Sequence, residues 1–426
     1  MMMDFFDDLE ARGLIHGASE GAREHMATGS VTGYIGFDPT APSLHVGSLL
    51  PILALARLQR AGHRPLAVVG GGTGMIGDPS GKTKERQLLT RAQVEENVEG
   101  LRTQLSRFLD FSGTYAARLV DNHDWLGPAG LIEFLRDIGK HFTVNYMLAK
   151  DSVSRRLEQA DGLSFTEFAY MLLQAYDFLV LSDRYDCTLQ MGGSDQWGNI
   201  TAGIELIRRA RGRAAHGIVL PLVTTASGVK FGKTEAGTVW LDAERTSPFR
   251  FYQFWLNTDD RDVERYLKAF TFLSLDEIAE VTAEQAADPA ARVGQRRLAI
   301  EVTRMVHGTD GLERAEQATG VLFGSRAAHE LGAAELLDVF ADVPSTEMPR
   351  TRLDGEGLAV VDLLAEAGIT ASKGEARRLI AGGGVYLNGE RIATADLRVQ
   401  SDDAIEGKVL LLRKGKKHNH VVRVVG

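Results

Sequence analysis

The stretch VTGYIGFDPTAPSLHVGSLLPILALARLQR, residues 31–60, joins a short apolar strand pattern to a helical pattern through a polar loop. Side chains alternate between the two faces of a strand, so Tyr34, Gly36 and Asp38 are predicted to share one face. That face could present a phenol and a carboxylate to a ligand cleft, but it is equally typical of a strand with one solvated side. The strand by itself leaves both interpretations open.

The loop that follows the strand ends at a helix start. Proline is tolerated only in the first turn of a helix, so Pro51 fixes that start near Gly47 and Ser48. His45 and Gly47 are then predicted to lie at a helix N-terminus, where free N–H groups and the helix dipole attract phosphate. A lone histidine before a helix is usually a cap, but the strand–loop–helix context favours a phosphate site.

The rest of the chain extends this α/β pattern and then departs from it. Short apolar runs alternate with helical patterns through residues 1–246, which predicts a Rossmann-like domain built on a parallel sheet. Residues 247–324 are helical throughout and predict a separate helical domain. Residues 325–354 are poorly periodic and suggest a linker. Residues 355–426 form a small α/β pattern whose Asn-Gly pair predicts a two-residue hairpin.

Composition narrows the class of protein. The chain has 426 residues, enough for two to four domains, and a net charge of −9 argues against bulk nucleic-acid binding. From Lys373 to the C-terminus, however, 11 Lys and Arg residues face 6 Asp and Glu residues. A basic module on an acidic body is expected where only that module contacts phosphates, although a solvated surface has the same composition.

The composition also indicates the cellular compartment of the protein. A single cysteine, Cys187, excludes an internal disulfide and fits a reducing environment. The first residues, MMMDFFDDLEARGLI, are acidic and lack the pattern of a signal peptide. No apolar run reaches the roughly 18 residues that span a bilayer. We therefore expect a cytoplasmic protein.

The glycine-rich stretch GGGTGMIGDPSGKT, residues 70–83, resembles two nucleotide motifs and satisfies neither. The dinucleotide fingerprint requires a helix within the glycines, which the Asp-Pro-Ser-Gly run prevents. The P-loop requires four residues between its glycines, and Gly77 and Gly81 leave three. We interpret the segment as a loop that brings Lys82 and Arg86 near an anion; a solvated basic loop is the alternative.

Three further segments carry polar side chains in suggestive positions. In the helical pattern 164–181, Tyr170, Gln174 and Asp177 fall on one face opposite an apolar stripe. This face could receive a polar aromatic ligand or could be an ordinary solvated face. The other two segments are LQMGGSDQWGN, with Gln190, Gly193, Asp195 and Gln196 at a strand end, and the loop KFGKT, with Lys230, Lys233 and Thr234.

The order and spacing of these segments resemble the bacterial tyrosyl-tRNA synthetases, class I ligases, over essentially the whole chain. HVGS at 45–48 resembles the first signature of the class, HIGH, and KFGKT at 230–234 resembles the second, KMSKS. Both depart from the generic motif, most visibly at Ser48. YMLLQAYDF and GGSDQWGNI are more specific to the tyrosine branch. VDLLAEAGI, KGEARRLI and VYLNGERI resemble an S4 RNA-binding domain.

The resemblance implies a role for each candidate residue. It implies tyrosine-binding residues Tyr34, Thr73, Asp78, Tyr170, Gln174, Asp177 and Gln196. It implies ATP-binding residues Gly36, Asp38, Gly47, Ser48, Gln190, Gly193 and Asp195. It implies catalytic phosphate contacts from Thr40, His45, Lys82, Arg86, Lys230, Lys233 and Thr234. It implies RNA contacts from Lys373, Arg377 and Arg378 in the S4-like region.

The partners implied are L-tyrosine, ATP and tRNA(Tyr), with a homodimer as the assembly. Mg²⁺ is expected to arrive on the phosphates of ATP, without a protein metal site. Four alternatives have to be weighed against this expectation: a ligase for tryptophan, a small-molecule nucleotidylyltransferase, a non-catalytic RNA-binding protein on the same scaffold, and a dehydrogenase.

Overall fold

A computed structural model describes residues 4–78, 89–150, 153–154, 157, 163–228, 231–234, 237–415 and 418–426. Contacts divide the chain into two compact units. The first comprises residues 1–246 and 255–302, and the second residues 247–254 and 303–426. No helix within the described ranges is long and apolar enough to cross a membrane.

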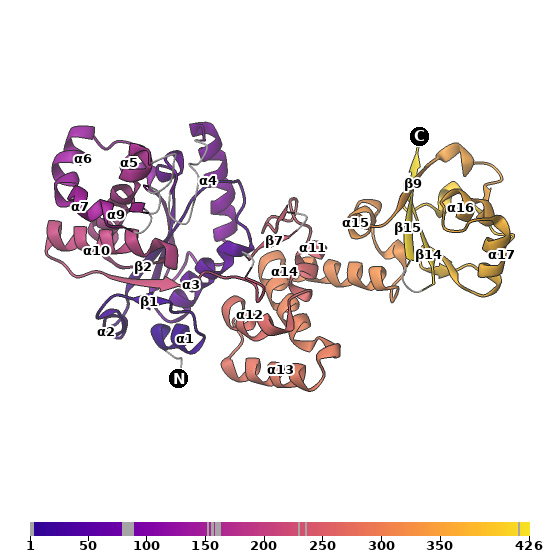
Figure 1. Ribbon diagram of the computed structural model, residues 1–426, viewed down its shortest axis with the longest axis horizontal. Helices are drawn as coiled ribbons and strands as arrows, with labels where there is room; N and C mark the ends of the chain where they lie inside the picture. The colour runs from indigo at the N-terminus through magenta and orange to yellow at the C-terminus, as the bar shows by residue number, and fades with distance from the viewer. Residues whose placement is uncertain are drawn as a thin grey trace. The chain divides into compact units, whose positions relative to one another are not determined.

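The first unit is built on a six-stranded sheet with the order β1-β6-β5-β2-β3-β4. Figure 1 labels two of its strands, β1 and β2. Its strands are β1 (Gly17–Ala18), β2 (Thr32–Phe37), β3 (Arg64–Val69), β4 (Arg118–Asp121), β5 (Cys187–Gly193) and β6 (His216–Leu220). All neighbours are parallel except the short β1, which is antiparallel to β6. The predicted α/β class is confirmed.

The strand order reverses direction between β2 and β5. The chain runs outward through β2, β3 and β4 on one side and through β5 and β6 on the other. Right-handed crossovers then place α3 (Leu49–Arg60) and α10 (Trp197–Arg211) on opposite faces of the sheet. The gap where the order reverses is the usual ligand site of an open α/β sheet.

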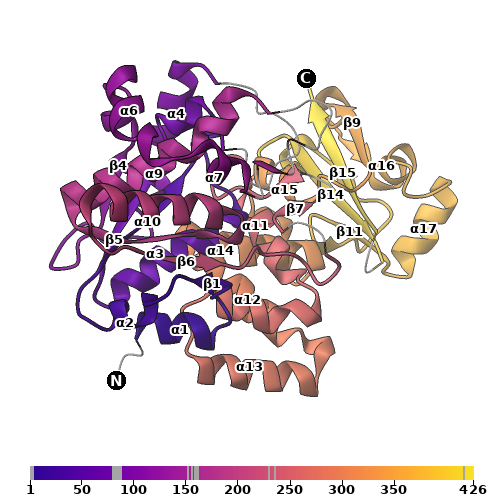
Figure 2. The same ribbon diagram turned by 60° about the vertical axis from the view of Figure 1, so that its left-hand side comes forward.

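The remaining helices that the structure describes within residues 1–246 cover the sheet or extend from it (Figure 2). They are α1 (Phe5–Ala11), α2 (Ala22–Met26), α4 (Arg91–Leu105), α5 (His123–Leu126), α6 (Leu131–Asp137), α7 (Val144–Leu148) and α9 (Phe165–Tyr185). The long helix α9 is capped by Ser164, whose hydroxyl accepts a hydrogen bond from the amide of Glu167. Its apolar stripe packs with Tyr34 and Leu66 of the sheet in one core.

The predicted helices after residue 247 are present, but their grouping differs from the expected boundaries. They are α11 (Pro248–Leu256), α12 (Val263–Phe270), α13 (Leu275–Ala287) and α14 (Val293–Phe323). Residues 255–302 group with the sheet instead of forming a unit with the rest of 247–324. The physical reason is that α12 packs on α3, a tertiary contact that periodicity does not reveal.

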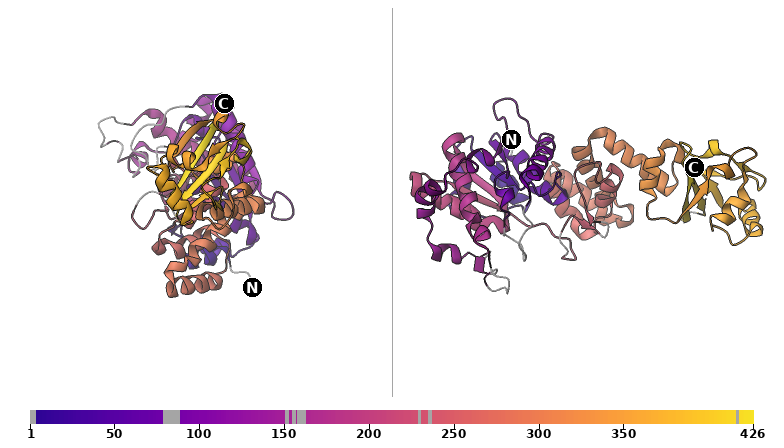
Figure 3. Two further views of the ribbon diagram at one scale, coloured as in Figure 1. Left: turned by 90° about the vertical axis from the view of Figure 1, so that its right-hand side faces the viewer. Right: turned by 90° about the horizontal axis from the view of Figure 1, so that it is seen from above.

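The second unit carries a five-stranded sheet with the order β12-β11-β14-β15-β9, whose yellow strands face the viewer in the left view of Figure 3. The strands are β9 (Ser345–Pro349), β11 (Val385–Leu387), β12 (Glu390–Arg391), β14 (Val409–Lys414) and β15 (His418–Val425); β10 (Leu358–Ala359) and β13 (Arg398–Val399) form a separate pair. Its helices after α14 are α15 (Ala333–Val339), α16 (Val360–Glu366) and α17 (Lys373–Ala381).

Two predictions for this unit have different outcomes. Asn388 and Gly389 both have positive φ and join β11 to β12, as the hairpin prediction requires. Residues 325–354, expected to be a linker, instead contain α15 and β9, and β9 pairs with β15. Elements of seven and five residues are too short to show a clear period, which explains the difference.

Candidate active site

A cleft of about 370 Å³ opens where β2 and β5 end, at the point where the strand order reverses. Most of the residues singled out in the sequence line it. They are Tyr34, Gly36, Asp38, Thr40, His45, Gly47, Ser48, Thr73, Asp78, Tyr170, Gln174, Asp177, Gln190, Gly193, Asp195 and Gln196. Segments more than a hundred residues apart in the chain therefore meet in one site.

The deep end of the cleft presents a phenol and a carboxylate. Tyr34 is 2% exposed, and its hydroxyl has no hydrogen-bond partner among the described residues. Asp177, from α9, is also buried, and burial raises the pKa of its carboxyl group to about 7. A buried hydroxyl without a partner costs free energy, so this end of the cleft is suited to a ligand that supplies the missing hydrogen bond.

Two residues that the sequence reasoning missed hold the Asp177 carboxylate. Trp125 Nε1 donates to Oδ1 at 2.7 Å, and Asn122 Nδ2 donates to Oδ2 at 3.0 Å. Both hydrogen bonds lower the pKa of Asp177 and so oppose the effect of burial. Asn122 and Trp125 follow β4 directly in the run DNHDW. Polar residues at the carboxyl end of a parallel strand were the available signal.

A chain of amides lines the neighbouring wall. Gln196 Nε2 donates to Asp78 Oδ2 at 2.7 Å, and Gln174 Nε2 donates to Gln196 Oε1 at 3.2 Å. Asn199, a third residue missed from the sequence, donates to Gln174 Oε1 at 3.0 Å. This network fixes the orientation of each amide, because every donor needs an acceptor in a buried site.

The electrostatic potential at the same wall is negative. Burial raises the pKa of the Tyr170 phenol well above its usual value, and the carboxylates of Asp38, Asp78 and Asp177 add to that effect. A hydrogen bond with Thr73 acts in the opposite direction. Carboxylates concentrated around a neutral phenol and amides favour a cationic group of a ligand.

The outer end of the cleft is formed by the start of α3. His45 caps the 3₁₀ turn Val46–Ser48, and its Nδ1 accepts a hydrogen bond from the Gly47 amide at 3.0 Å. Helix α3 follows directly, with Pro51 in its first turn as predicted. The helix N-terminus therefore opens toward the cleft, where it can attract an anion.

The two signature segments lie against each other. Gly232 has a φ of +84°, and a Cβ atom built on it would lie 2.8 Å from Val46 Cγ2. Val46 in turn donates its amide to the carbonyl of Val239, and Val239 donates to the carbonyl of Gly232. The second signature is thus linked to the first by main-chain hydrogen bonds through Val239, and the Val46 side chain leaves no space for a side chain at residue 232.

Some predicted catalytic residues fall beyond what is described. Lys82, Arg86 and Lys230 lie outside the described residues. Lys233 and Thr234 form the short strand β7, which pairs with β8 (Gly237–Thr238), and only their backbone is described. The phosphate contacts expected of these five residues stay predictions.

The predicted RNA-binding residues lie on α17 of the second unit. Arg377 and Arg378 are exposed, as is Lys373, which forms an ion pair with Asp362 at 2.8 Å. Ser372 caps the helix through the Glu375 amide. The structure therefore brings these residues together on one exposed element of the second unit, whereas the cleft residues belong to the first unit.

The described part of the chain contains no group of three or more His, Cys, Asp or Glu side chains that could hold a metal ion. The chemical character of the cleft is instead that of buried hydroxyl, amide and carboxylate groups at one end and a helix N-terminus at the other. Such a site can bind a polar aromatic molecule beside a polyphosphate.

Comparison with known proteins identifies the class. Residues 26–324 match the family of class I tRNA synthetases (W and Y), and residues 335–422 match the C-terminal domain of SYY-like tyrosine–tRNA ligases. The chain therefore belongs to the class I tRNA synthetases of the tryptophan and tyrosine type.

Individual relatives narrow the class further. A tyrosine–tRNA ligase of Roseiflexus castenholzii is 56% identical over 425 residues, which is 100% of both chains. One of Anaeromyxobacter dehalogenans is 54% identical, covering 99% of this chain and 100% of its own. A C-terminally truncated mitochondrial tyrosyl-tRNA synthetase of Aspergillus nidulans superposes with a TM-score of 0.68 at 34% identity, over 75% of this chain and 94% of its own. The chain belongs to the tyrosine–tRNA ligases, which confirms the resemblance and the enzyme class.

Proposed function

We propose that the cleft activates L-tyrosine with ATP, giving tyrosyl-adenylate and pyrophosphate, and that the tyrosyl group then passes to the 3′ end of tRNA(Tyr). The observation that carries this proposal is the buried hydroxyl of Tyr34, which has no partner among the described residues and shares the cleft with Asp177. A substrate phenol can donate to the carboxylate of Asp177 and accept from the Tyr34 hydroxyl, which would satisfy both groups.

The remainder of tyrosine fits the adjoining wall. Asp78, Tyr170, Gln174 and Thr73 would surround the ammonium group, because this wall concentrates carboxylate and hydroxyl acceptors. Gln196 would lie beside the substrate carboxylate. The amide network between Gln174, Gln196 and Asn199 would hold these contacts in place before the substrate arrives.

The first chemical step depends on the placement of the reacting groups more than on proton transfer. The tyrosine carboxylate attacks the α-phosphorus of ATP, and the bond to the bridging oxygen breaks with release of pyrophosphate. A carboxylate is already nucleophilic, so catalysis depends on in-line geometry and on neutralising charge on the leaving phosphates. His45 at the helix start and Thr40 in the loop before it would contact the terminal phosphate, with Lys82, Arg86, Lys230, Lys233 and Thr234 around the pyrophosphate.

The ATP nucleoside would lie along the strand ends. Gly36 leaves open surface, since a Cβ atom built on it would meet nothing within 4 Å, and Asp38, Gly47, Ser48, Gln190, Gly193 and Asp195 line the same region. Mg²⁺ would enter on the phosphates, as expected for an ion that prefers phosphate and water oxygens. In the second step a ribose hydroxyl of the terminal adenosine of tRNA attacks the carbonyl carbon of the adenylate and releases AMP.

The second unit would contact tRNA through its basic residues. Lys373, Arg377 and Arg378 are exposed on α17, in a C-terminal region where basic residues outnumber acidic ones. The helices of 247–324 would serve the anticodon region and the part from 355 onward the variable arm. Catalysis and tRNA selection would then be assigned to different parts of the chain.

A homodimer in the cytoplasm completes the proposal. Apolar side chains on α6 and α7 are exposed, among them Leu131, Ile132, Leu135 and Val144. A patch of this kind marks an interface, and a second copy of the chain is the partner proposed here. Sedimentation of an Ile132→Glu variant tests this point: a shift from dimer to monomer is expected, and an unchanged mass would contradict it.

Exchange of pyrophosphate into ATP, measured with each of the twenty amino acids in turn, tests the activation step. Tyrosine alone should support rapid exchange. Charging of bulk tRNA with labelled tyrosine tests the second step. Rapid exchange with tryptophan, or none with tyrosine, would overturn the assignment.

A further inference from the structure

Helix α12 contacts the second signature segment and the helix that follows the first signature, through separate sets of residues. It is an eight-residue helix, Val263–Phe270, between the second-signature strand and α13. One set of contacts is aromatic and involves Phe231, the second residue of KFGKT. The other set consists of hydrogen bonds from two arginines, one at the end of α1 and one on α3, the helix that begins at the first signature.

The aromatic contacts hold the second signature. The Phe231 ring stacks on Phe270 with centroids 5.1 Å apart and an interplanar angle of 14°, and it meets Tyr266 edge-on at 5.0 Å. Trp255 lies against the same ring at 5.6 Å. Phe231 is 5% exposed. Aromatic pairs in this geometry add to the ordinary gain of apolar burial and fix the ring's orientation.

The residues just before the second signature are bound by the other end of α12. The carboxylate of Asp262 accepts the amide of Ala226 at 2.7 Å, and the Tyr266 hydroxyl donates to the carbonyl of Thr224 at 3.1 Å. Arg265 also donates to that carbonyl. The segment that carries the second signature is therefore attached to α12 on both sides of the residues that are not described.

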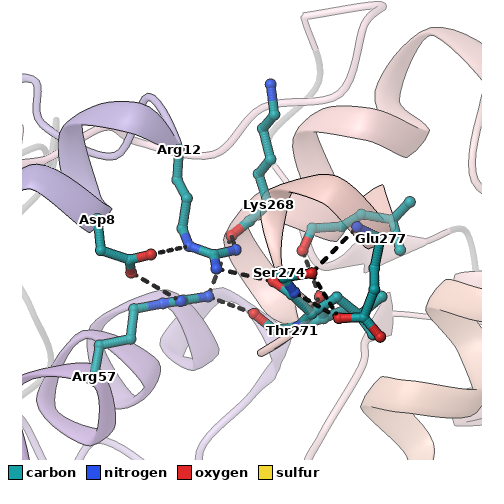
Figure 4. Close-up of polar contacts among 9 residues, drawn as sticks. Asp8, Arg12, Arg57, Lys268, Thr271, Ser274 and Glu277 are labelled. Carbon is teal, nitrogen blue, oxygen red and sulfur yellow. Dashed lines mark hydrogen bonds and ion pairs between the residues drawn. The ribbon is translucent and has the colours of Figure 1, made fainter. Parts of the chain in front are cut away.

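The hydrogen bonds from these two arginines hold the C-terminal end of α12 to α1 and α3 (Figure 4). Arg57 of α3 donates to the carbonyls of Lys268 and Thr271, and Arg12 donates to the carbonyls of Lys268 and Leu273. The carboxylate of Asp8 accepts from both guanidinium groups, at 2.8 Å from Arg12 and 3.2 Å from Arg57. Cations at a helix C-terminus satisfy its last carbonyls and complement its dipole.

Because its side chains are buried, this cluster of charged groups stabilises the fold only at a cost in desolvation free energy. The Arg12 and Arg57 side chains are only 6% and 5% exposed, and burial lowers the pKa of Arg57 to about 10, so it stays charged at neutral pH. Apolar residues of similar volume often serve stability as well as a buried ion cluster does. The planar guanidinium group of each arginine instead fixes the orientation of α12, because it bonds two carbonyls in a fixed geometry.

We propose that α12 sets the position of Phe231–Gly232 against Val46–Gly47, with Arg57 and Phe231 acting as positioning residues for adenylate formation. Arg57 fixes α12 relative to the helix of the first signature, and Phe231 fixes the second signature relative to α12. Neither residue lines the cleft. The inference rests on the role proposed for the second signature, which the Lys233→Ala variant tests separately.

The test is a double-mutant cycle on the single-turnover rate of tyrosyl-adenylate formation. The variants are Arg57→Met, Phe231→Leu and the double variant, with tyrosine affinity and thermal unfolding measured for each. Arg261→Met is the matched control, since this arginine near the start of α12 is 67% exposed and pairs with Asp259 at the surface. Arg57→Lys replaces Arg57→Met if the latter does not fold, because it keeps the charge and loses the planar guanidinium group.

We expect each single variant to slow adenylate formation about tenfold, because small displacements of positioning groups reduce reaction rates strongly. Tyrosine affinity should change less than about twofold, because the phenol end of the cleft is untouched. The double variant should be no slower than the slower single variant, since both break the same link. Multiplied losses of about a hundredfold, or a normal rate in folded Arg57→Met, would overturn the proposal. A slowed control would also overturn it.

Discussion

Trp125 Nε1 lies 2.7 Å from Asp177 Oδ1, so an indole from a short helix after β4 fixes the carboxylate at the deep end of the cleft. The two residues are 52 positions apart in the chain. With Asn122 on the other oxygen, each carboxylate oxygen of Asp177 has one protein donor. Its remaining acceptor capacity is available to a substrate phenol.

Tyrosine affinity should rise with pH through about 7. The pKa of Asp177 is raised to about 7 by burial, so the free enzyme gains the ionised acceptor as pH passes that value. The free energy of unfolding should fall over the window from about 4 to about 7, because there the folded side chain holds a proton that the unfolded one has lost. Fluorescence titration with tyrosine between these pH values checks the first effect.

Two variants sharpen this prediction. Asp177→Asn should abolish the pH dependence of binding in this window. Trp125→Phe should move the midpoint upward, because the lost hydrogen bond is one that lowers the pKa of Asp177. A midpoint unchanged in Trp125→Phe would contradict the geometry described here.

Phenylalanine should be activated far more slowly than tyrosine, because it leaves the Tyr34 hydroxyl without a partner and supplies no donor to the remaining acceptor capacity of the Asp177 carboxylate. Tyr34→Phe should reduce the preference for tyrosine by about five- to tenfold, the worth of one neutral hydrogen bond. Asp177 substitutions should cost more, since a charged acceptor is lost. Pyrophosphate exchange with both amino acids measures the ratio; activation of phenylalanine within tenfold of tyrosine would remove both residues from recognition.

Gly232→Ala should slow adenylate formation without weakening tyrosine binding. The new Cβ would meet Val46 Cγ2 at 2.8 Å and would force apart the two signature segments. Gly228→Ala is a matched control, because Gly228 has a similar positive φ of +80° but nothing within 4 Å of its Cβ position. Stopped-flow measurement of both variants separates crowding from backbone strain: equal rates in the two would mean that the contact with Val46 is unimportant.

Lys233→Ala should lower the rate of adenylate formation far more than it lowers tyrosine affinity. The proposed contact with the leaving pyrophosphate strengthens in the transition state, so its loss appears in the chemical step. Single-turnover kinetics at saturating ATP give the rate, and equilibrium titration gives the affinity. A normal rate of activation would exclude Lys233 from the mechanism.

Replacing Arg377 and Arg378 together by alanine should weaken tRNA charging and leave pyrophosphate exchange unchanged. Each lost phosphate contact should reduce the slope of log affinity against log salt by about one. Arg326→Ala, which removes a surface arginine paired with Glu330 in the same unit, is the control. Charging by the double variant that equals the control at every salt concentration would remove α17 from the RNA interface. Substitution is preferable to truncation near residue 354, because β9 would lose its partner β15.

The amino-acid sequence by itself determined the local elements of the site. Pro51 set the start of α3, Ser164 the start of α9, and the Asn388–Gly389 pair the hairpin between β11 and β12. Each of these features depends on the backbone preferences of a few neighbouring residues. The order and spacing of the signature segments were likewise sufficient to indicate the family.

Tertiary structure alone decided which distant residues meet. Asn122 and Trp125 were not found from the sequence because their role depends on α9 passing over the end of β4. The same holds for the attachment of α12 to Arg12 and Arg57, which joins residues 255–302 to the sheet. Periodicity shows that an element has a buried face, but it does not show which distant element covers that face. Helix α15 and strand β9 were missed for a related reason, because elements this short are stabilised mainly by their partners.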